Sequence, residues 1–526
     1  MDKYKVCILA AGVGSRMGDL SKHVNKAVLP INFKAVISHI IEKFKPEIEI
    51  VIAVGHKKES IVSYLKIAHP ERKITFIEIS EYLGPGTGPG FSLLQCRVAL
   101  QCPFIFFAAD TIVLEEVPEP DKNWFGIAPV KNPEQYCTVK IKGNLVYEIV
   151  DKVKSNNKFA FIGLAGIHNY EDFFLALERN KEPISGEIQV SNGFKSLLEK
   201  ELEPVGFTWF DTGTLKNYTE TNKNLSGDKK FDFSKGDEFL YFVNGMVIKY
   251  FADKEIVKKR YERSKLLSGL CPKIESIQDN FFAYKKIDGH VLYNILNNDV
   301  FNNFLQWASS NLWKKQSLNR SGQAKFHAAC KEFYYDKTMA RLDLFYKKTG
   351  IVDIDHKING TNVPTLKSLF SRIDWDLFYK GTPVTIHGDL QFDNVLVTRD
   401  SASQLDKFVL LDWRQDFGGL TETGDLYYDL AKLYGGMILS YQLIKEGKFS
   451  FDMSGSSVYC NYYIQNDLLE AKELYEEFLL DNGYDLKKIK ILVGLIFLNM
   501  SPLHHDPFDH LLYFLGKSII YRNIDK

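Results

Sequence analysis

Short apolar runs alternate with amphipathic stretches over roughly the first 225 residues. Runs such as YKVCILAA (4–11), IEIVIAVG (48–55) and PFIFFAAD (103–110) have the length of buried strands, whereas AVISHIIEKF (35–44) and KESIVSYLKIA (58–68) repeat apolar residues at helical spacing. Strands that alternate with helices in this way form parallel sheets with crossover helices. We therefore predict an α/β domain with a doubly wound, Rossmann-like sheet over residues 1–225, with ligands at the carboxyl ends of its strands.

The pattern changes after residue 225. The segment 226–238 is polar and contains glycines and lysines, which is typical of a linker. FLYFVNGMVIKYF (239–251) follows as two apolar runs joined by Asn-Gly, the strongest short signal for a β-hairpin. Beyond about residue 291 helical periodicity predominates. These features predict a second, α+β domain over 239–526, with a small antiparallel lobe at about 239–290 and a larger helical lobe at about 291–526.

The composition narrows the range of partners. At 526 residues the chain is longer than one hydrophobic core usually organises, which agrees with two domains. Its 66 basic residues balance 66 acidic ones, so net charge gives it no affinity for nucleic acid or an anionic membrane. The seven cysteines are scattered without C-x-x-C pairs, which favours free thiols in a reducing cytoplasm over disulfides or zinc. We expect a cytoplasmic protein that acts on small molecules, and an oligomer is compatible with the sequence.

A glycine-rich turn follows the first predicted strand. ILAAGVGSRMG (8–18) precedes NKAVLPI (25–31), so that two cations, Arg16 and Lys26, come close behind the turn. Glycines let backbone N–H groups approach phosphate oxygens, and the two cations match the charge of a triphosphate. An ordinary turn between a strand and a helix is the alternative interpretation of this segment taken alone.

The turn and six later segments together resemble the sugar-1-phosphate nucleotidyltransferases, whose signature is L-A-A-G-x-G-x-R-M followed by K-x-L-x-P. Asp151 and Val153 stand where that family usually has glutamate and proline, which bears on the identity of the sugar and not on nucleotidyl transfer. The six later segments, in the order of the family, are GPGTGPGFSLL (84–94), FFAAD (106–110), NPEQYCTVKI (132–141), DKVKSN (151–156), GEIQVSN (186–192) and WFDTGTLKNY (209–218).

This resemblance implies a reaction in which a sugar phosphate oxygen attacks the α-phosphorus of a nucleoside triphosphate and pyrophosphate leaves. Asp110 and Asp211, each at a strand end, would bind the Mg²⁺ that stabilises the developing charge. Arg16 would hold the β- and γ-phosphates and Lys26 the α-phosphate. The remaining implied contacts are the backbone of Ala11, Gly12, Gly14, Gly86 and Gly88 to phosphate and base, Lys152 to the sugar phosphate, and Glu187 to the sugar hydroxyls.

A second set of chemically apt residues lies in TIHGDLQFDNVLV (385–397) and FVLLDW (408–413). Transfer of a phosphoryl group from ATP needs an aspartate that accepts the proton of the attacking hydroxyl, with an amide and a carboxylate that hold magnesium under the triphosphate. Asp389, Asn394 and Asp412 have the spacing of those three groups, with Asp412 at the end of an apolar strand.

These segments resemble the aminoglycoside phosphotransferase and choline kinase superfamily, whose fold is bilobal and similar to that of protein kinases. The resemblance implies Asp389 as the general base and Asn394 and Asp412 as ligands of a second Mg²⁺ site. Lys249 on the hairpin would contact the α- and β-phosphates, with Glu262 as its ion-pair partner and Glu255 as the alternative. We expect structural roles for three further side chains near these segments, which are His387, Asp425 and Asp429.

The two resemblances predict a bifunctional enzyme for nucleotide-sugar synthesis that feeds cell-surface glycans. The C-terminal domain would phosphorylate a sugar at its anomeric hydroxyl with ATP, and the N-terminal domain would join the product to a nucleotide from CTP, GTP, UTP or dTTP. One alternative is a choline or ethanolamine kinase fused to a cytidylyltransferase, because the many aromatic residues could form a cage for a quaternary ammonium. A binding or regulatory protein with one inactive domain is the other.

Overall fold

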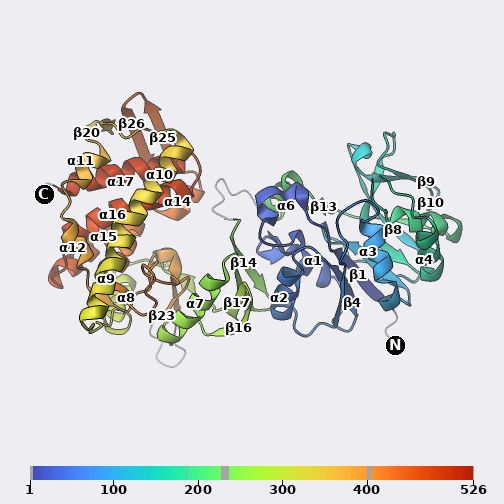
Figure 1. Ribbon diagram of the computed structural model, residues 1–526, viewed down its shortest axis with the longest axis horizontal. Helices are drawn as coiled ribbons and strands as arrows, with labels where there is room; N and C mark the ends of the chain where they lie inside the picture. The colour runs from blue at the N-terminus through green and yellow to red at the C-terminus, as the bar shows by residue number, and fades with distance from the viewer. Residues whose placement is uncertain (1–3, 185, 227–235, 400–405, 525–526) are drawn as a thin grey trace. The chain divides into compact units, whose positions relative to one another are not determined.

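The computed structural model describes residues 4–184, 186–226, 236–399 and 406–524, and they form two compact units (Figure 1). The first unit contains the N-terminal residues up to 226 together with 236–254 and 275–286. The second contains 255–274 and the chain from 287 onward. Most of the expected linker, residues 227–235, lies outside the described residues.

The first unit is built around a nine-stranded sheet in which the path β10-β9-β11-β6-β1-β4-β5 is extended by β8, which pairs with β11 and β12. Strands β1, β4, β5 and β6 pair in parallel, as predicted, whereas β11 runs antiparallel to β6, β8 and β9. The strands of this unit are β1 (Lys5–Ala10), β2 (Pro30–Ile31), β3 (Lys34–Ala35), β4 (Ile50–Val54), β5 (Ile74–Glu78), β6 (Phe104–Ala108), β7 (Thr111–Val113), β8 (Trp124–Pro129), β9 (Cys137–Lys142), β10 (Leu145–Asp151), β11 (Phe159–Ile167), β12 (Glu203–Gly206), β13 (Trp209–Asp211), β14 (Glu238–Val243), β15 (Met246–Phe251), β16 (Ile274–Gln278) and β17 (Phe281–Lys285).

Helices cover both faces of this sheet, because its central strands are apolar on both sides. Val6 and Ile8 of β1 point into a core shared with the first two helices, and Cys7 between them points into a second core on the other face. The mixed α/β architecture predicted for the N-terminal part is therefore confirmed. The helices of this unit are α1 (Val36–Ile41), α2 (Lys58–Ala68), α3 (Pro89–Gln95), α4 (Tyr170–Arg179), α5 (Ser191–Phe194) and α6 (Leu215–Ser226), with 3₁₀ turns η1 (Ser15–Ser21), η2 (Lys26–Val28), η3 (Arg97–Ala99), η4 (Pro133–Gln135) and η5 (Lys195–Lys200).

A four-stranded antiparallel sheet, in the order β14-β15-β17-β16, shares the first of these cores. Tyr241 and Tyr250 are buried in it, and their hydroxyl groups donate to backbone carbonyls of the 23–28 segment. The hairpin at Asn244-Gly245 forms as predicted. We expected this sheet to belong to the second domain, but its aromatic face packs into a core of the first unit.

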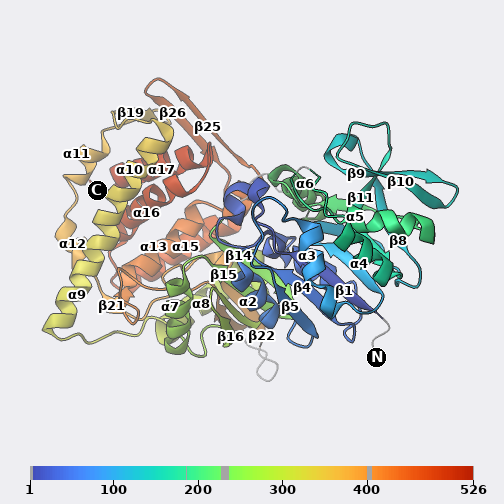
Figure 2. The ribbon, with the colours of Figure 1, turned by 45° about the vertical axis from the view of Figure 1, so that its right-hand side comes forward.

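The second unit is mostly helical beyond residue 291, as predicted. Within it α13 packs against α15 and α16 (Figure 2). In the part of the chain that the structure describes, every helix is too short or too polar to cross a lipid bilayer. The helices are α7 (Lys254–Leu266), α8 (Asn298–Asn311), α9 (Arg320–Lys331), the π-helix η7 (Glu332–Asp336), α10 (Lys337–Thr349), α11 (Leu366–Phe370), α12 (Trp375–Tyr379), α13 (Leu426–Ile438), α14 (Tyr441–Lys445), α15 (Asn466–Asp481), α16 (Leu486–Met500) and α17 (Phe508–Ile524), with 3₁₀ turns η6 (Leu292–Asn294), η8 (Phe392–Asn394) and η9 (Ser501–Leu503).

Short strands connect these helices. The pair β22 and β23 forms a hairpin whose ends lie beside one another, which positions the segments before and after it. The strands of the second unit are β18 (His290–Val291), β19 (His356–Ile358), β20 (Thr361–Val363), β21 (Pro383–Val384), β22 (Val395–Arg399), β23 (Asp406–Leu410), β24 (Gly424–Asp425), β25 (Phe449–Ser454) and β26 (Ser457–Tyr462).

Candidate functional sites

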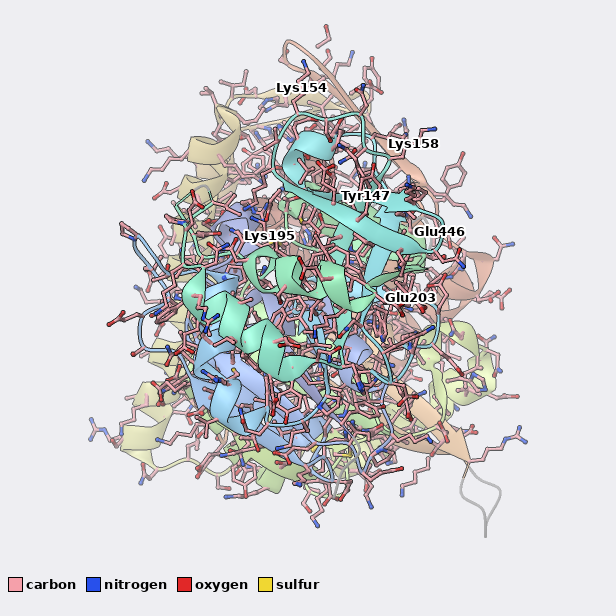
Figure 3. All side chains as sticks on the ribbon, turned by 90° about the vertical axis from the view of Figure 1, so that its right-hand side faces the viewer. Tyr147, Lys154, Lys158, Lys195, Glu203 and Glu446 are labelled. Atoms are coloured by element: carbon pink, nitrogen blue, oxygen red, sulfur yellow. The ribbon has the colours of Figure 1, made fainter. Side chains whose placement is uncertain are left out.

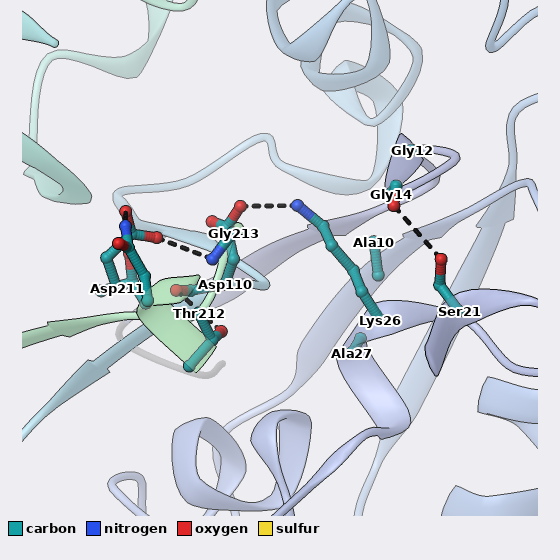
Figure 4. A network of polar contacts seen from close by, with 12 residues as sticks. Ala10, Gly12, Gly14, Ser21, Lys26, Ala27, Asp110, Asp211, Thr212 and Gly213 are labelled. Atoms are coloured by element: carbon teal, nitrogen blue, oxygen red, sulfur yellow. Dashed lines mark hydrogen bonds and ion pairs between the residues drawn. The ribbon is translucent and has the colours of Figure 1, made fainter. Parts of the chain in front are cut away.

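Two aspartates face each other at the carboxyl end of β6 in the first unit. Asp110 follows β6, and Asp211 ends β13, which pairs antiparallel with β7 so that Asp211 lies opposite Thr111. Gly213 lies between the carboxylates: a β-carbon there would come within 3.0 Å of Asp110 Oδ2 and of Asp211 Oδ1, and 3.5 Å from a guanidinium nitrogen of Arg16. The predicted metal ligands and the predicted phosphate-binding arginine therefore share one small space. Figure 4 shows Asp110, Asp211 and Gly213 close together.

Lys26 completes this cluster. Its Nζ lies 2.5 Å from Asp110 Oδ2. Burial raises the pKa of Asp110, but Lys26 and Arg16 offset that effect, so that the pKa lies below its usual value. The pKa of Asp211 is raised, first by burial and then by the negative charge of Asp110. A divalent cation between the carboxylates would relieve this repulsion, and oxygen ligands of this kind suit Mg²⁺.

The turn after β1 is shaped to leave backbone exposed above the cluster. Gly14 adopts a left-handed conformation with φ 68°, and a β-carbon there would lie 3.5 Å from the side chain of Lys26. Gly12 is exposed, with no atom within 4 Å of where a β-carbon would be, while Ala11 is buried beneath it. Asn25 fixes the following segment, because its amide donates to the carbonyls of Ala10 and His56 and its Oδ1 accepts from Ala27 N.

The predicted base-binding and sugar-binding segments meet beside α3. Gly86 N donates to Gly186 O at 3.3 Å, and a β-carbon on Gly88 would lie 2.8 Å from Cβ of Glu187. Glu187 is exposed and accepts a hydrogen bond from the amide of Gln189. Gly88 is therefore required for the close approach of these two segments, whereas Gly86 has open space at its β-carbon position and is favoured there by its φ of 82°.

Lys152 stands in an exposed, lysine-rich loop after β10 that also carries Lys154 and Lys158 (Figure 3). Lys152 has φ 51° and its backbone N–H donates to Tyr136 O at 3.1 Å. Tyr136 in turn donates from its hydroxyl to Asp211 Oδ2 at 3.4 Å, so that one residue connects this loop to the carboxylate pair.

Tyr136 and Asn217 are contacts of Asp211 that the sequence analysis did not identify. Asn217 Nδ2 lies 2.5 Å from Asp211 Oδ2, and Gly213 N donates to Asp211 Oδ1 at 2.7 Å. Both side chains lie within segments already recognised by their resemblance to the nucleotidyltransferases. Tyr136 stands just before β9 and Asn217 six residues after Asp211. Neither position gives a local signal in the sequence, because the contact depends on how separate strands meet.

The residues predicted in the second unit also converge. The amide of Asn394 donates to Asp389 O at 2.8 Å and approaches Asp389 Oδ2 at 3.4 Å. Across the β22–β23 hairpin, Leu411 N donates to Asn394 O at 2.8 Å, which places Asp412 beside Asn394. Asp412 has φ 58° and its Oδ1 lies 3.4 Å from Nη1 of Arg260 on α7. An acid, an amide and a second acid thus occupy one corner of the unit.

Buried side chains hold this corner in place. Asp429 of α13 accepts hydrogen bonds from the backbone N–H groups of His387 and Gly388, each at 2.7 Å, and burial raises its pKa to about 6. Burial lowers the pKa of His387 to about 4, so the ring is neutral at pH 7 and bonds to Leu411 O. The expected structural roles agree with these contacts, except that Asp429 supports the 385–397 segment and not its own helix. Asp425 is the N-cap of α13, as expected.

Two cations of this corner were not identified from the sequence. Lys432, buried on α13, lies 2.6 Å from Asp389 Oδ1. Burial raises the pKa of Asp389, but the charge and hydrogen bond of Lys432, together with a hydrogen bond from Gln391, hold the pKa below its usual range. Arg263 on α7 is also buried and donates to the carbonyls of Ile386 and Thr421. No sequence motif marks either residue. Lys432 reaches Asp389 from α13, and Arg263 reaches the loop before Asp389 from α7.

Lys249 and Glu262 belong to different compact units. Lys249 is buried on β15, and Glu262 and its alternative Glu255 are exposed on α7. The expected ion pair between Lys249 and Glu262 stays a prediction.

Comparison with known proteins bears on the first of the two sites. Residues 5–227 match the family described as nucleotidyl transferase. The bifunctional protein GlmU of Methanocaldococcus jannaschii is 31% identical over 250 residues, which cover 46% of this chain and 59% of that protein. The UTP–glucose-1-phosphate uridylyltransferase of Mycoplasma pneumoniae is 27% identical over 289 residues, which cover 45% of this chain and 96% of that protein.

A crystal structure of UDP-glucose pyrophosphorylase complexed with UDP-glucose overlays with a TM-score of 0.37 at 19% identity, covering 42% of this chain and 98% of that one. The chain spans about half the length of the first curated relatives it matches, 59%, 51% and 46% of three GlmU proteins. From the family match and the sequence relatives, together with the α/β sheet, we conclude that the N-terminal part of the chain, residues 5–227, is a nucleotidyltransferase domain.

Proposed function

We propose that the protein is a bifunctional enzyme that makes a nucleotide-activated sugar in two steps. The C-terminal unit phosphorylates a small hydroxyl compound with ATP, and the N-terminal domain transfers a nucleotidyl group to the resulting phosphate with release of pyrophosphate. The observation that carries the first part is the pair of carboxylates around Gly213 in a domain of the nucleotidyltransferase family. The convergence of Asp389, Asn394 and Asp412 supports the second part.

In the N-terminal domain, Asp110 and Asp211 would hold Mg²⁺, which when bound neutralises charge on the triphosphate. Arg16 binds the terminal phosphates as they become pyrophosphate. Lys26, now paired with Asp110, exchanges that partner for the α-phosphate oxygens when the nucleotide binds. The backbone N–H groups of the exposed Gly12 and the half-buried Gly14 donate hydrogen bonds to phosphate oxygens. Lys152 brings the attacking sugar phosphate into line.

In the C-terminal unit, Asp389 orients the attacking hydroxyl and takes its proton as the bond to the γ-phosphorus forms. Asn394 and Asp412 would hold Mg²⁺, which when bound draws charge from the β- and γ-phosphates. Lys432 keeps Asp389 ionised, so that the carboxylate is ready to accept a hydrogen bond from the acceptor. Asp429 and Arg263 fix the backbone on which Asp389 is mounted.

The test is a product screen with the full-length protein. ATP is combined with each of CTP, GTP, UTP and dTTP and with a panel of sugars, sugar derivatives and amino alcohols, and nucleotide-linked products are identified by mass. We expect one nucleotide-linked sugar derivative whose formation requires ATP, a second nucleotide and Mg²⁺. Formation of CDP-choline or CDP-ethanolamine would show that the substrate is an amino alcohol and not a sugar. Absence of any nucleotide-linked product and of pyrophosphate would refute the proposed function.

A further inference from the structure

Three cations, Lys337, Arg341 and Arg414, gather near the segment that carries Asp389 in the second unit. Lys337 Nζ lies 4.1 Å from the centre of the Phe333 ring, and the guanidinium carbon of Arg414 lies 4.9 Å from the same ring. Arg341, one helical turn beyond Lys337 on α10, is close enough for its charge to act on Lys337. All three side chains are half-buried. Like charges held this close together are unfavourable unless something else compensates them.

No carboxylate of the described residues makes an ion pair with Lys337, Arg341 or Arg414. The acids nearby already have their own partners, because Asp416 pairs with Lys259 at 2.8 Å, Asp389 with Lys432 and Asp412 with Arg260. Arg414 Nε is buried and has no hydrogen-bond partner within the described part of the chain. The cluster therefore has unsatisfied positive charge and an unsatisfied donor.

The cluster packs against the segment that carries Asp389. Arg414 N donates to His387 O at 3.0 Å, and a β-carbon on Gly388 would lie 2.7 Å from Cβ of Arg414, so that the arginine packs against the residue that precedes Asp389. Lys337 follows η7, a π-helical turn between the α-helices α9 and α10. π-helical turns are rare in proteins. Such interruptions are frequent at functional sites, because they re-aim the side chains of one turn.

Burial and the neighbouring cations Arg414, Arg341 and Lys432 lower the pKa of Lys337 to about 6, against a smaller opposing effect of the Asp416 carboxylate. The resident charges thus repel a further proton on Lys337. An anion placed among them would restore that proton and supply the acceptor that Arg414 Nε lacks. A cationic acceptor such as choline would meet repulsion at the same place.

We propose that Lys337, Arg341 and Arg414 bind an anionic group of the phosphoryl acceptor, so that the substrate of the C-terminal site is a hydroxyl compound that carries a carboxylate or a phosphate. This inference rests on the proposed kinase function of the same site and narrows its substrate class. A sugar acid and a sugar phosphate share this chemistry, and the choline alternative does not.

The experiment compares four kinds of acceptor with the full-length protein and ATP, following ADP release: neutral hexoses, the corresponding uronic acids, hexose 6-phosphates and choline. We expect a kcat/KM for an anionic acceptor at least roughly tenfold above that for its neutral parent, as for a hydrogen bond to a charged group. The uronic acid and the sugar phosphate arms identify which anion is used. Equal or better use of a neutral hexose or of choline overturns the inference.

A variant locates the effect. Arg341→Gln should raise the KM for the anionic acceptor roughly tenfold and leave the KM for ATP within about twofold, whereas Lys347→Gln, an exposed cation on the same helix, should change neither. A rise in the KM for ATP alone would assign the cluster to the triphosphate and overturn the inference. Calorimetric titration of the best anionic acceptor in the absence of ATP separates the two proposals. If the acceptor binds, Arg341→Gln abolishes that binding and no acceptor causes ADP release, the kinase proposal is refuted and the anion site is retained. If the acceptor neither binds nor causes ADP release, both proposals are refuted.

Discussion

The hydroxyl of Tyr241 donates a hydrogen bond to the backbone carbonyl of Val28 at 3.0 Å, and thereby ties β14 to the turn that carries Lys26. Tyr250 on the next strand does the same for His23 at 3.1 Å. The sheet β14–β17 is therefore a structural part of the nucleotidyltransferase unit, although it lies beyond the residues that match that family. A change in this sheet reaches the position of Lys26 through two hydrogen bonds.

Removal of these hydroxyls should weaken the first unit. Tyr241→Phe leaves the carbonyl of Val28 buried without its donor, so we expect a loss of roughly 1 kcal/mol in the free energy of unfolding, measured by urea denaturation. The double variant with Tyr250→Phe should lose more and should raise the KM for the nucleotide, because Lys26 is less well fixed. Tyr147→Phe, on an exposed tyrosine, is the matched control and should be neutral. An unchanged stability in the double variant would show that the sheet does not support the turn.

Asp211 gives a test of the metal site by stability alone. Burial and Asp110 raise its pKa above the ordinary value of 3.8, so its contribution to stability is present below that value and is lost as the pH rises through the folded-state pKa. Asp211→Asn should therefore make the metal-free protein as stable as the wild type or more so at pH 7. Addition of Mg²⁺ should raise the melting temperature of the wild type and not of the variant.

Glu199→Gln removes an exposed carboxylate and should leave the Mg²⁺ effect intact. An equal Mg²⁺ effect in wild type and Asp211→Asn would place the ion elsewhere.

The ion pair between Lys432 and Asp389 should be strongly coupled. Lys432→Met leaves Asp389 without its cation, and we expect a loss of roughly 1–3 kcal/mol, below that of a fully buried pair because Asp389 is partly open to solvent. Adding Asp389→Asn to Lys432→Met should recover much of that loss, which urea denaturation of the two single variants and the double variant measures. Additive losses in the double variant would mean that the two side chains do not interact.

The lowered pKa of Lys337 should make the stability of the folded protein depend on pH. Its pKa falls from the ordinary 10.5 to about 6 through burial and through Arg414, Arg341 and Lys432, so the unfolded chain binds the proton more tightly than the folded one. The loss of folding stability caused by protonated Lys337 is complete below about pH 6 and disappears as the pH approaches 10.5. Lys337→Met should therefore raise the melting temperature, by more at pH 6 than at pH 9, while it weakens use of an anionic acceptor. A variant that is less stable than the wild type at pH 6 would contradict this account of the cluster.

Local patterns in the sequence were sufficient for the parallel strands β1, β4 and β6 of the first sheet and for residues that stand next to them, but not for its antiparallel strands. Asp110 could be predicted because it directly follows an apolar strand, and Asp389 and Asn394 because their spacing is fixed within one short segment. Contacts between distant elements were not predictable in this way. Lys432 reaches Asp389 from α13, and the periodicity of that helix marks it only as amphipathic.

The association of β14–β17 with the first unit depends on a similar long-range contact. The alternation of FLYFVNGMVIKYF predicts a hairpin with one apolar face, and the hairpin is present. The pattern does not specify which core that face joins. Tyr241 and Tyr250 decide it, because their rings fill the first core and their hydroxyls find backbone carbonyls in it.

The central claim is that two separate sites act in sequence, and one measurement tests it most directly. Asp389→Asn and Asp110→Ala are each incubated with ATP, the nucleotide and the acceptor identified by the product screen, and all products are identified by mass. Asp389→Asn should form nucleotide-linked product from the supplied acceptor phosphate but none from the free acceptor, and Asp110→Ala should accumulate the acceptor phosphate without the nucleotide product. Loss of both reactions in either folded variant, or full product from the free acceptor by Asp389→Asn, would contradict the account.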